Sequence, residues 1–114
     1  MAEDSKPVYI RLREIIAASI LDGEFSDGDL LPSVRAFAAA QGANPLTVAK
    51  AYQSFQDDGL VVVKRGVGMF VAAGATRRLR EAERERFLET IWPPVAAQMR
   101  RLGLRIEDMD LAQA

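Results

Sequence analysis

The 114-residue sequence predicts an α+β fold over residues 1–75, followed by a short all-α region over residues 76–114. In the first part, apolar residues recur at three- and four-residue steps in successive segments, which is typical of amphipathic helices. Two runs rich in β-branched residues, 60–63 and 69–72, bracket a glycine-bearing turn and predict a β-hairpin. Beyond residue 76 only the helical periodicity continues, so the second part is expected to be helical throughout.

The first helix is expected over residues 7–22, closed by Gly23, after a loose tail at residues 1–6. Its predicted buried stripe consists of Leu12, Ile15, Ile16 and Ile20. Residues 25–29 are expected to form a turn-rich loop. Leu30 and Leu31 then predict a short strand that joins the hairpin as a third strand.

A pair of helices joined by a very short turn is predicted next. Ser33 is a suitable N-cap for a helix that ends near Gly42, because glycine suits the left-handed position after a helix. Asn44 followed by Pro45 is an N-cap with proline at the first helical position. A turn this short packs two helices roughly at right angles and lets the second lie in the major groove of DNA.

The second helix of this pair is expected to run from Pro45 to Gly59. Its predicted buried stripe is Val48, Ala51, Tyr52 and Phe55. The opposite side, near the amino end, carries Leu46, Thr47, Lys50 and Gln53. Polar groups and a cation there suit base edges and phosphates, although an ordinary solvated helix face has the same pattern.

The hairpin has a basic tip, Lys64-Arg65-Gly66-Val67-Gly68, between its two apolar strands. Lys64 and Arg65 are placed where a minor groove accepts cations, and Gly66 permits close approach of the backbone to a phosphate. The string lacks the lysine context and the strand-to-helix order of a nucleotide-binding loop. Helix pair and hairpin together predict a winged helix-turn-helix domain.

In this arrangement the sequence resembles the GntR family of transcriptional regulators, and its brevity resembles the YtrA-type subgroup. The resemblance covers about residues 7 to 72 and is carried by Pro7-Val8-Tyr9, Gly28 to Arg35, Asn44-Pro45, Thr47-Val48, Ala51-Tyr52, Gly59-Leu60 and Arg65 to Val71. It implies that operator DNA is contacted by the helix that begins after Ser33, by the amino end of the helix that begins at Pro45, and by the wing tip. The residues concerned are Ser33, Arg35, Asn44, Leu46, Thr47, Lys50, Lys64, Arg65 and Gly66.

The sequence departs from the family pattern at a few positions. Leu46 stands where relatives usually have a polar residue, and it is suited to touch a thymine methyl or pack on a sugar. Val67 replaces a frequent basic or polar residue in the wing, and Ala36 removes the acidic partner of a capping box. Asp57 and Asp58 oppose the dipole at the end of their helix, and the sequence offers no functional reason for them.

Composition limits the remaining possibilities. The net charge is −1, yet Arg35, Lys50, Lys64 and Arg65 cluster on the presumed DNA face, so selective binding to double-stranded DNA is expected. Cysteine and histidine are absent, which argues against disulfides, zinc fingers and imidazole or thiolate catalysis. We therefore expect no enzyme, no metal and no cofactor. No apolar run of transmembrane length and no cleavable leader is recognisable, so a cytoplasmic protein without membrane contact is expected.

Residues 76–114 predict a dimerisation region that begins after a hinge at Gly74-Ala75-Thr76. A solvated helix continues to Pro93-Pro94, which should kink or break it just before the first proline. A second segment, 95–102, ends at Gly103, and an amphipathic tail with Ile106, Met109 and Leu111 follows. One face is strongly apolar and consists of Leu88, Ile91, Trp92, Val95, Met99 and Leu102.

This face could pack on the winged helix of its own chain. Self-association into a homodimer is preferred, because two winged-helix domains related by symmetry would also account for recognition of a palindromic DNA site. The sequence therefore predicts a transcriptional regulator, a repressor that binds an inverted-repeat operator as a homodimer. The alternative is a winged helix that binds an acidic protein partner instead of specific DNA. An aminotransferase-like GntR regulator is disfavoured because the chain is too short for that catalytic domain. A small-molecule effector is possible, but the sequence does not identify one.

Overall fold

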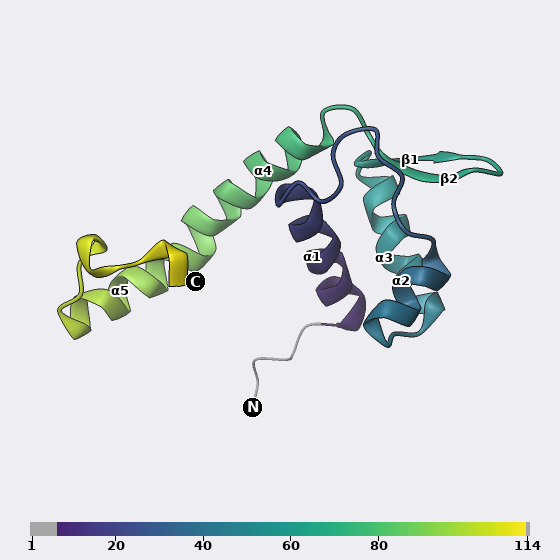
Figure 1. Cartoon of the computed structure of the whole chain (residues 1–114). Coiled ribbons are helices and arrows are strands. Elements are labelled where there is room, and N and C mark those ends of the chain that lie inside the picture. Colours follow the sequence, from purple (N-terminus) through teal and green to yellow (C-terminus); the bar gives the residue numbers. More distant parts are fainter. Residues whose placement is uncertain (1–6, 114) are drawn as a thin grey trace. The chain divides into compact units, whose positions relative to one another are not determined.

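The computed structural model describes residues 7–113 and divides the chain into two compact units, one ending at Arg80 and the other beginning at Glu81 (Figure 1). The loose tail expected at residues 1–6 lies outside the described residues. The first unit holds α1 (Val8–Leu21), α2 (Val34–Gln41), α3 (Pro45–Asp57) and the strands β1 (Val61–Lys64) and β2 (Gly68–Val71). It is the predicted winged helix-turn-helix fold.

The predicted caps form at both helices of the pair. The Ser33 hydroxyl oxygen accepts a hydrogen bond from the Ala36 backbone N–H at 3.1 Å, and Gly42 ends α2 in the left-handed conformation with φ of 62°. The Asn44 side-chain oxygen accepts from the Leu46 backbone N–H at 2.8 Å, with Pro45 at the start of α3. These bonds satisfy backbone donors that a helix start otherwise leaves without partners.

The wing is a two-stranded antiparallel sheet in which Val61 pairs with Val71 and Lys64 with Gly68. The expected third strand is reduced to a single bridge between Leu30 and Phe70. One reason is Pro32, which follows at once and has no N–H to continue a ladder. The Leu31 N–H still donates to the Met69 carbonyl at 2.8 Å, so the segment before α2 is attached to the wing.

The core of this unit lies between α1, α3 and the wing. The stripe predicted for α3 is buried as expected, and Phe55 and Val48 are fully covered. On α1, the prediction of Ile15 as a core residue was wrong, because its side chain is 43% exposed. Residues Leu12, Ile16 and Ile20 repeat every four positions and face α3, which leaves Ile15 on the flank while Ala17 is buried instead.

Helix α4 (Ala75–Arg86) starts within the first unit, where Ala75 and Leu79 are buried. Its first turn is held by Asp27, whose carboxylate accepts hydrogen bonds from the Gly74 N–H at 2.8 Å and from the Thr76 N–H at 3.1 Å and hydroxyl at 2.7 Å. The expected hinge is therefore a capped helix start. The division between units falls after Arg80, later than the boundary expected after residue 75.

The second unit contains the end of α4, a π-helical turn η2 (Phe87–Ile91) and α5 (Trp92–Leu102), followed by the short 3₁₀ turns η3 (Ile106–Asp108) and η4 (Leu111–Gln113). The sequence predicted a kink or a break just before Pro93. The helix does not break there but widens over η2, which contains the carbonyls that the two proline rings would otherwise meet. Gly103 ends α5 as expected, with φ of 70°. No helix among residues 7–113 is long and apolar enough to cross a membrane.

Candidate nucleic-acid interface

The amino end of α3 presents its side chains to solvent. Asn44, Leu46 and Lys50 are exposed, and Thr47 is half-buried. Leu46 is 80% exposed although it is a large apolar residue. The helix is held from behind by its buried stripe, so this outer face is presented rigidly.

The start of α2 is fixed against α3 by Tyr52. The Tyr52 hydroxyl donates a hydrogen bond to the Pro32 carbonyl at 2.7 Å, and its ring lies 6.0 Å from the ring of Phe37 on α2. Burial raises the pKa of Tyr52 to about 12, so the phenol remains a proton donor at neutral pH. This contact fixes the start of α2, where the side chains of Ser33 and Arg35 are exposed.

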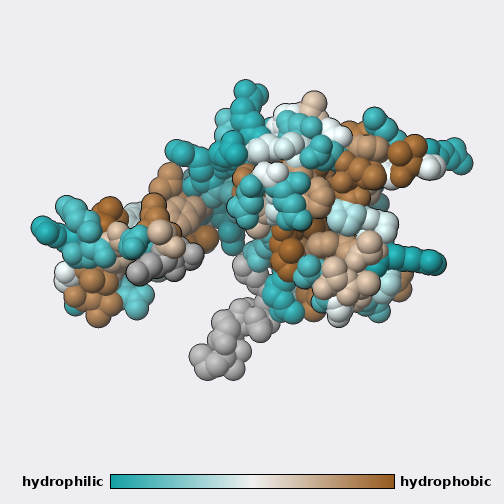
Figure 2. All heavy atoms as spheres, viewed as in Figure 1, coloured by the Kyte–Doolittle hydropathy of each residue, from teal (hydrophilic) through white to brown (hydrophobic). Residues whose placement is uncertain are grey.

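The wing presents apolar strands and a hydrophilic tip, as Figure 2 shows. Arg65 and Val67 are exposed at the tip, and the Lys64 ammonium lies 4.5 Å from the centre of the Phe70 ring. Gly66 has φ of 78° and Gly68 φ of 149°, conformations that favour glycine. A Cβ at Gly68 would also lie 2.8 Å from the Leu30 Cδ1 atom, so the leucine side chain would have to move to admit another residue there.

The four predicted cations are all exposed, but they differ in their surroundings. Lys50 lies with its ammonium 4.1 Å from the centre of the Tyr9 ring, and this cation–π contact holds it toward α1. Arg35 stands at the start of α2, while Lys64 and Arg65 belong to the wing tip. The cations are thus presented by the helix pair and the wing of a single unit.

A shallow groove of about 340 Å³ separates α2 from the wing. Its walls are mostly apolar, and they are formed by residues of the loop before α2, of α3, of both wing strands and of the wing turn: Leu30, Pro32, Ser33, Tyr52, Val63, Val67 and Met69. The groove therefore lies between two of the elements predicted to contact DNA.

Contacts at the carboxyl end of α3 explain Asp58, which the sequence pattern left without a function. The Arg13 guanidinium on α1 bonds the Asp58 carboxylate and the Ser54 hydroxyl. The Arg78 guanidinium on α4 donates to the backbone carbonyls of Asp58 at 2.7 Å and Gly59 at 3.1 Å. These cations offset the negative end of the helix dipole. Residues so distant in sequence share no local pattern from which this contact could be predicted.

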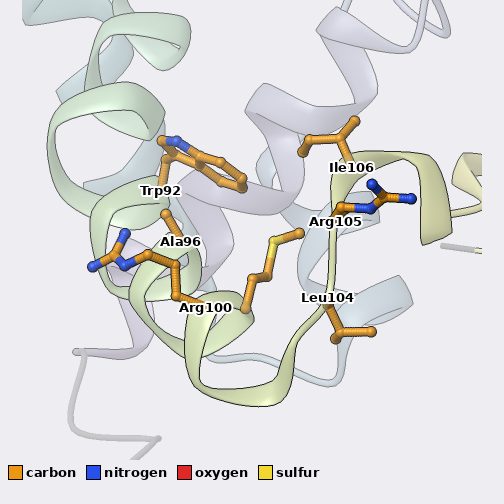
Figure 3. Close-up of a pocket in the computed structure, with 7 residues that line it drawn as sticks. Trp92, Ala96, Arg100, Leu104, Arg105 and Ile106 are labelled. Atoms are coloured by element: carbon orange, nitrogen blue, oxygen red, sulfur yellow. The ribbon is translucent and has the colours of Figure 1, made fainter.

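The second unit has a shallow pocket of about 200 Å³ between α5 and the segment that follows it. Trp92, Leu104 and Ile106 contribute apolar surface, and Figure 3 shows the guanidinium groups of Arg100 and Arg105 directed away from one another. Of the residues predicted to form a dimer interface, Leu88, Val95 and Leu102 are exposed, while Ile91, Trp92 and Met99 are half-buried.

The family model for bacterial regulatory proteins of the gntR family matches residues 8–71. The chain belongs to this family. Among curated proteins it is similar to the uncharacterized HTH-type transcriptional regulator YhcF of Bacillus subtilis, with 31% identity over 94% of this chain and 87% of that protein. It is also similar to the HTH-type transcriptional repressor YtrA of Bacillus subtilis, with 35% identity over 69% of this chain and 61% of the repressor.

Solved structures resemble the chain as well. A GntR family transcriptional regulator from Listeria monocytogenes superposes with a TM-score of 0.70 and 27% identity, covering 93% of this chain and 91% of that one. The DNA-binding domain of AraR in complex with operator ORX1 has a TM-score of 0.56 and 27% identity, covering 59% of this chain and 81% of that domain. The relatives from Bacillus subtilis and Listeria monocytogenes are named transcriptional regulators or repressors, and the gntR chain described here shares the fold of the solved structures.

Proposed function

We propose that this gntR-family chain is a transcriptional repressor that binds an inverted-repeat operator as a homodimer. The observation that carries the proposal is the combination of an exposed amino end of α3 with a basic wing tip in one unit. A related winged helix, that of AraR, has been solved on operator DNA. A relative with 35% identity is named a transcriptional repressor.

In the proposed complex the amino end of α3 enters the major groove. Asn44, Thr47 and Leu46 then face base edges, since the first turns of a recognition helix make such contacts. Ser33 and Arg35 approach the same groove from the start of α2, where Arg35 is suited to a bidentate bond with guanine. Occupying promoter DNA in this way blocks access to it, which is the simplest route to repression.

The wing completes the proposed contact in the adjacent minor groove. Arg65 lies in the turn at the tip and enters the groove, while Lys64, the last residue of β1, meets phosphate. Gly66 has no side chain that would separate the backbone from the sugar-phosphate chain. Such contacts supply affinity that depends strongly on salt.

The second unit, residues 81–114, supports the proposed homodimer. The predicted face combines exposed Leu88, Val95 and Leu102 with half-buried Ile91 and Trp92. Contact between two copies of this face, related by a two-fold axis, buries apolar surface that the two short helices leave exposed to water. The same symmetry gives the dimer two recognition helices. Duplicated recognition helices require an operator that is an inverted repeat.

Selection of bound sequences from random duplex DNA tests the proposal. We expect an inverted repeat to be enriched, and we expect the Arg35→Ala, Arg65→Ala double variant to bind it weakly. A bidentate arginine–guanine contact is worth about 1–3 kcal/mol, so each half-site should lose at least that much.

Arg77→Ala is the matched control, because it removes an exposed cation beside Arg78, which contacts the opposite, carboxyl end of α3. Its operator affinity should stay close to wild type. Full operator affinity in the double variant would refute the assigned contacts. Absence of any enriched sequence, together with salt-sensitive capture of an acidic protein, would favour the protein-interaction alternative.

A further inference from the structure

Leu46 is an unusual residue for the position it occupies. It is the second residue of α3 and is 80% exposed, while its neighbours on the other side of the helix, Val48 and Ala51, are completely buried. A single exposed leucine on a protein surface is common. This one, however, projects from the first turn of the helix that we propose to enter the major groove.

The direction of Leu46 is fixed by the local backbone. Its N–H donates to the Asn44 side chain at 2.8 Å, and the next residue, Thr47, donates its N–H to the Asn44 carbonyl at 3.0 Å. Pro45 restricts the backbone at the first helical position. The leucine side chain is therefore held outward on an ordered turn.

The polar side chains of the same face are engaged within the protein. Counting helical steps from Leu46, the residues on its face are Ala49, Lys50 and Gln53, all exposed. Lys50 lies over the Tyr9 ring, and the Gln53 side-chain amide donates to the Asp57 carboxylate at 2.9 Å. What this face presents at the start of α3 is the apolar pair Leu46 and Ala49.

We infer that Leu46, with Ala49 beside it, recognises the 5-methyl group of a thymine, so that each operator half-site requires a T·A pair at the position facing the first turn of α3. This inference rests on the proposed DNA-binding function. The thymine methyl is the apolar group that base edges present in the major groove, and aliphatic side chains contact it. Burying it against leucine removes both apolar surfaces from water.

A cycle of protein and DNA changes tests this specificity contact. Each thymine of the selected operator is replaced in turn by deoxyuridine, which lacks only the methyl group and keeps the Watson–Crick edge. For wild-type protein, one symmetry-related pair of positions should lose affinity about fourfold per methyl, the value expected for one buried carbon group. For the Leu46→Ala variant, the same replacement should have little effect.

Val67→Ala is the matched protein control, because Val67 is a 65% exposed apolar residue at the wing tip. In this variant the deoxyuridine effect at the assigned position should remain about fourfold. The thermal unfolding of Leu46→Ala should match wild type, since the side chain it removes is exposed.

The outcomes distinguish a failure of the methyl contact from a failure of the proposed DNA-binding function. Selective operator binding by wild type without any deoxyuridine-sensitive position would overturn the methyl contact and leave the proposed function intact. A sensitive position that is equally sensitive in Leu46→Ala would assign the contact to another residue and also overturn the inference. Failure of wild type to bind any selected duplex would overturn both.

Discussion

Tyr52 shows how one residue of the recognition helix serves the core and the interface together. Its ring belongs to the buried stripe of α3, and its hydroxyl bonds the carbonyl of Pro32 just before α2. Burial of the ring raises its pKa to about 12, because the charged phenolate is poorly solvated there. The neutral phenol is therefore the form that stabilises the fold.

The variant Tyr52→Phe tests this contact through its pH dependence. At pH near 7 the variant should lose about 0.5–1.5 kcal/mol of unfolding free energy, because the Pro32 carbonyl loses its donor. A folded pKa above the ordinary value of about 10 means that the contribution of the phenol is present below pH 10 and is lost as pH rises toward about 12. The difference in unfolding free energy between wild type and Tyr52→Phe, measured by urea unfolding, should therefore become smaller at alkaline pH. An equal gap at both pH values would contradict this assignment.

Single residues also mark where sequence reasoning succeeded and where it failed. Ser33, Gly42 and Asn44 could be predicted because caps depend on residues a few positions apart. Ile15 was assigned to the buried stripe of α1 because it is apolar and fits the helical spacing. The stripe that is buried instead includes Leu12, Ile16 and Ala17, and Ile15 lies at its edge. The role of Asp58 could not be predicted, because its partner Arg13 is distant in sequence and is brought near only by packing of α1 on α3.

At the scale of elements, local sequence signals predicted which helices form, but they did not predict how contacts with neighbouring segments change the type or length of an element. The two prolines of α5 were expected to kink or break the helix, and the helix accommodates them through the wider π turn observed at Phe87–Ile91. Likewise the strand expected at Leu30 is shortened to one bridge beside the wing. Both outcomes depend on the hydrogen bonds available in three dimensions, which a single segment of sequence does not specify.

Helix α4 depends on a cap from outside its own segment. Asp27, in the loop between α1 and α2, accepts three hydrogen bonds at the start of α4. The hydroxyl of Thr76 contributes most to lowering the pKa of this carboxyl, and the backbone N–H groups of Thr76 and Gly74 contribute further. A negative charge here also suits the positive end of the helix dipole.

Asp27→Asn should reveal this cap through acid unfolding. Since the folded pKa is lowered, the stabilisation by Asp27 is fully present above the ordinary value of about 3.9 and is lost as pH falls through the folded value. At neutral pH the variant should therefore unfold at lower urea concentration than wild type, and the two should converge in strong acid. Glu24→Gln is the control for removing one negative charge from the same loop. A difference that persists unchanged into strong acid would show that charge is not the cause.

On the scale of the whole winged-helix unit, α3 is held near its middle and at its carboxyl end by other elements. Tyr52 connects it to the segment before α2, whereas Arg13 of α1 and Arg78 of α4 bond the residues at its carboxyl end. These contacts fix α3 within its unit, and the side chains of the proposed DNA-contacting face remain exposed. The charge of the chain as a whole, −1, does not indicate this role, since what matters is where the cations lie.

Trp92 provides the test of assembly for the whole molecule. It is half-buried in the second unit, its ring is stacked at 6.5 Å from that of Phe87, and it belongs to the proposed two-fold face. Large aromatic residues near the centre of an interface often contribute about 2 kcal/mol or more. We therefore expect Trp92→Ala to weaken the dimer about 30-fold or more, a ratio that corresponds to this free energy.

Sedimentation at low micromolar concentration measures this shift toward monomer, and the control is Leu111→Ala, which removes an 88% exposed leucine outside the proposed face. The Trp92 variant should lose affinity for the full inverted repeat while its binding to a single half-site stays unchanged, because the winged helix is a separate compact unit. A wild-type monomer, or a variant that dimerises as tightly as wild type, would show that the apolar face is covered in another way. Equal losses on the half-site and the full site would instead trace the effect to the winged helix, since dimerisation contributes only where both recognition helices are bound.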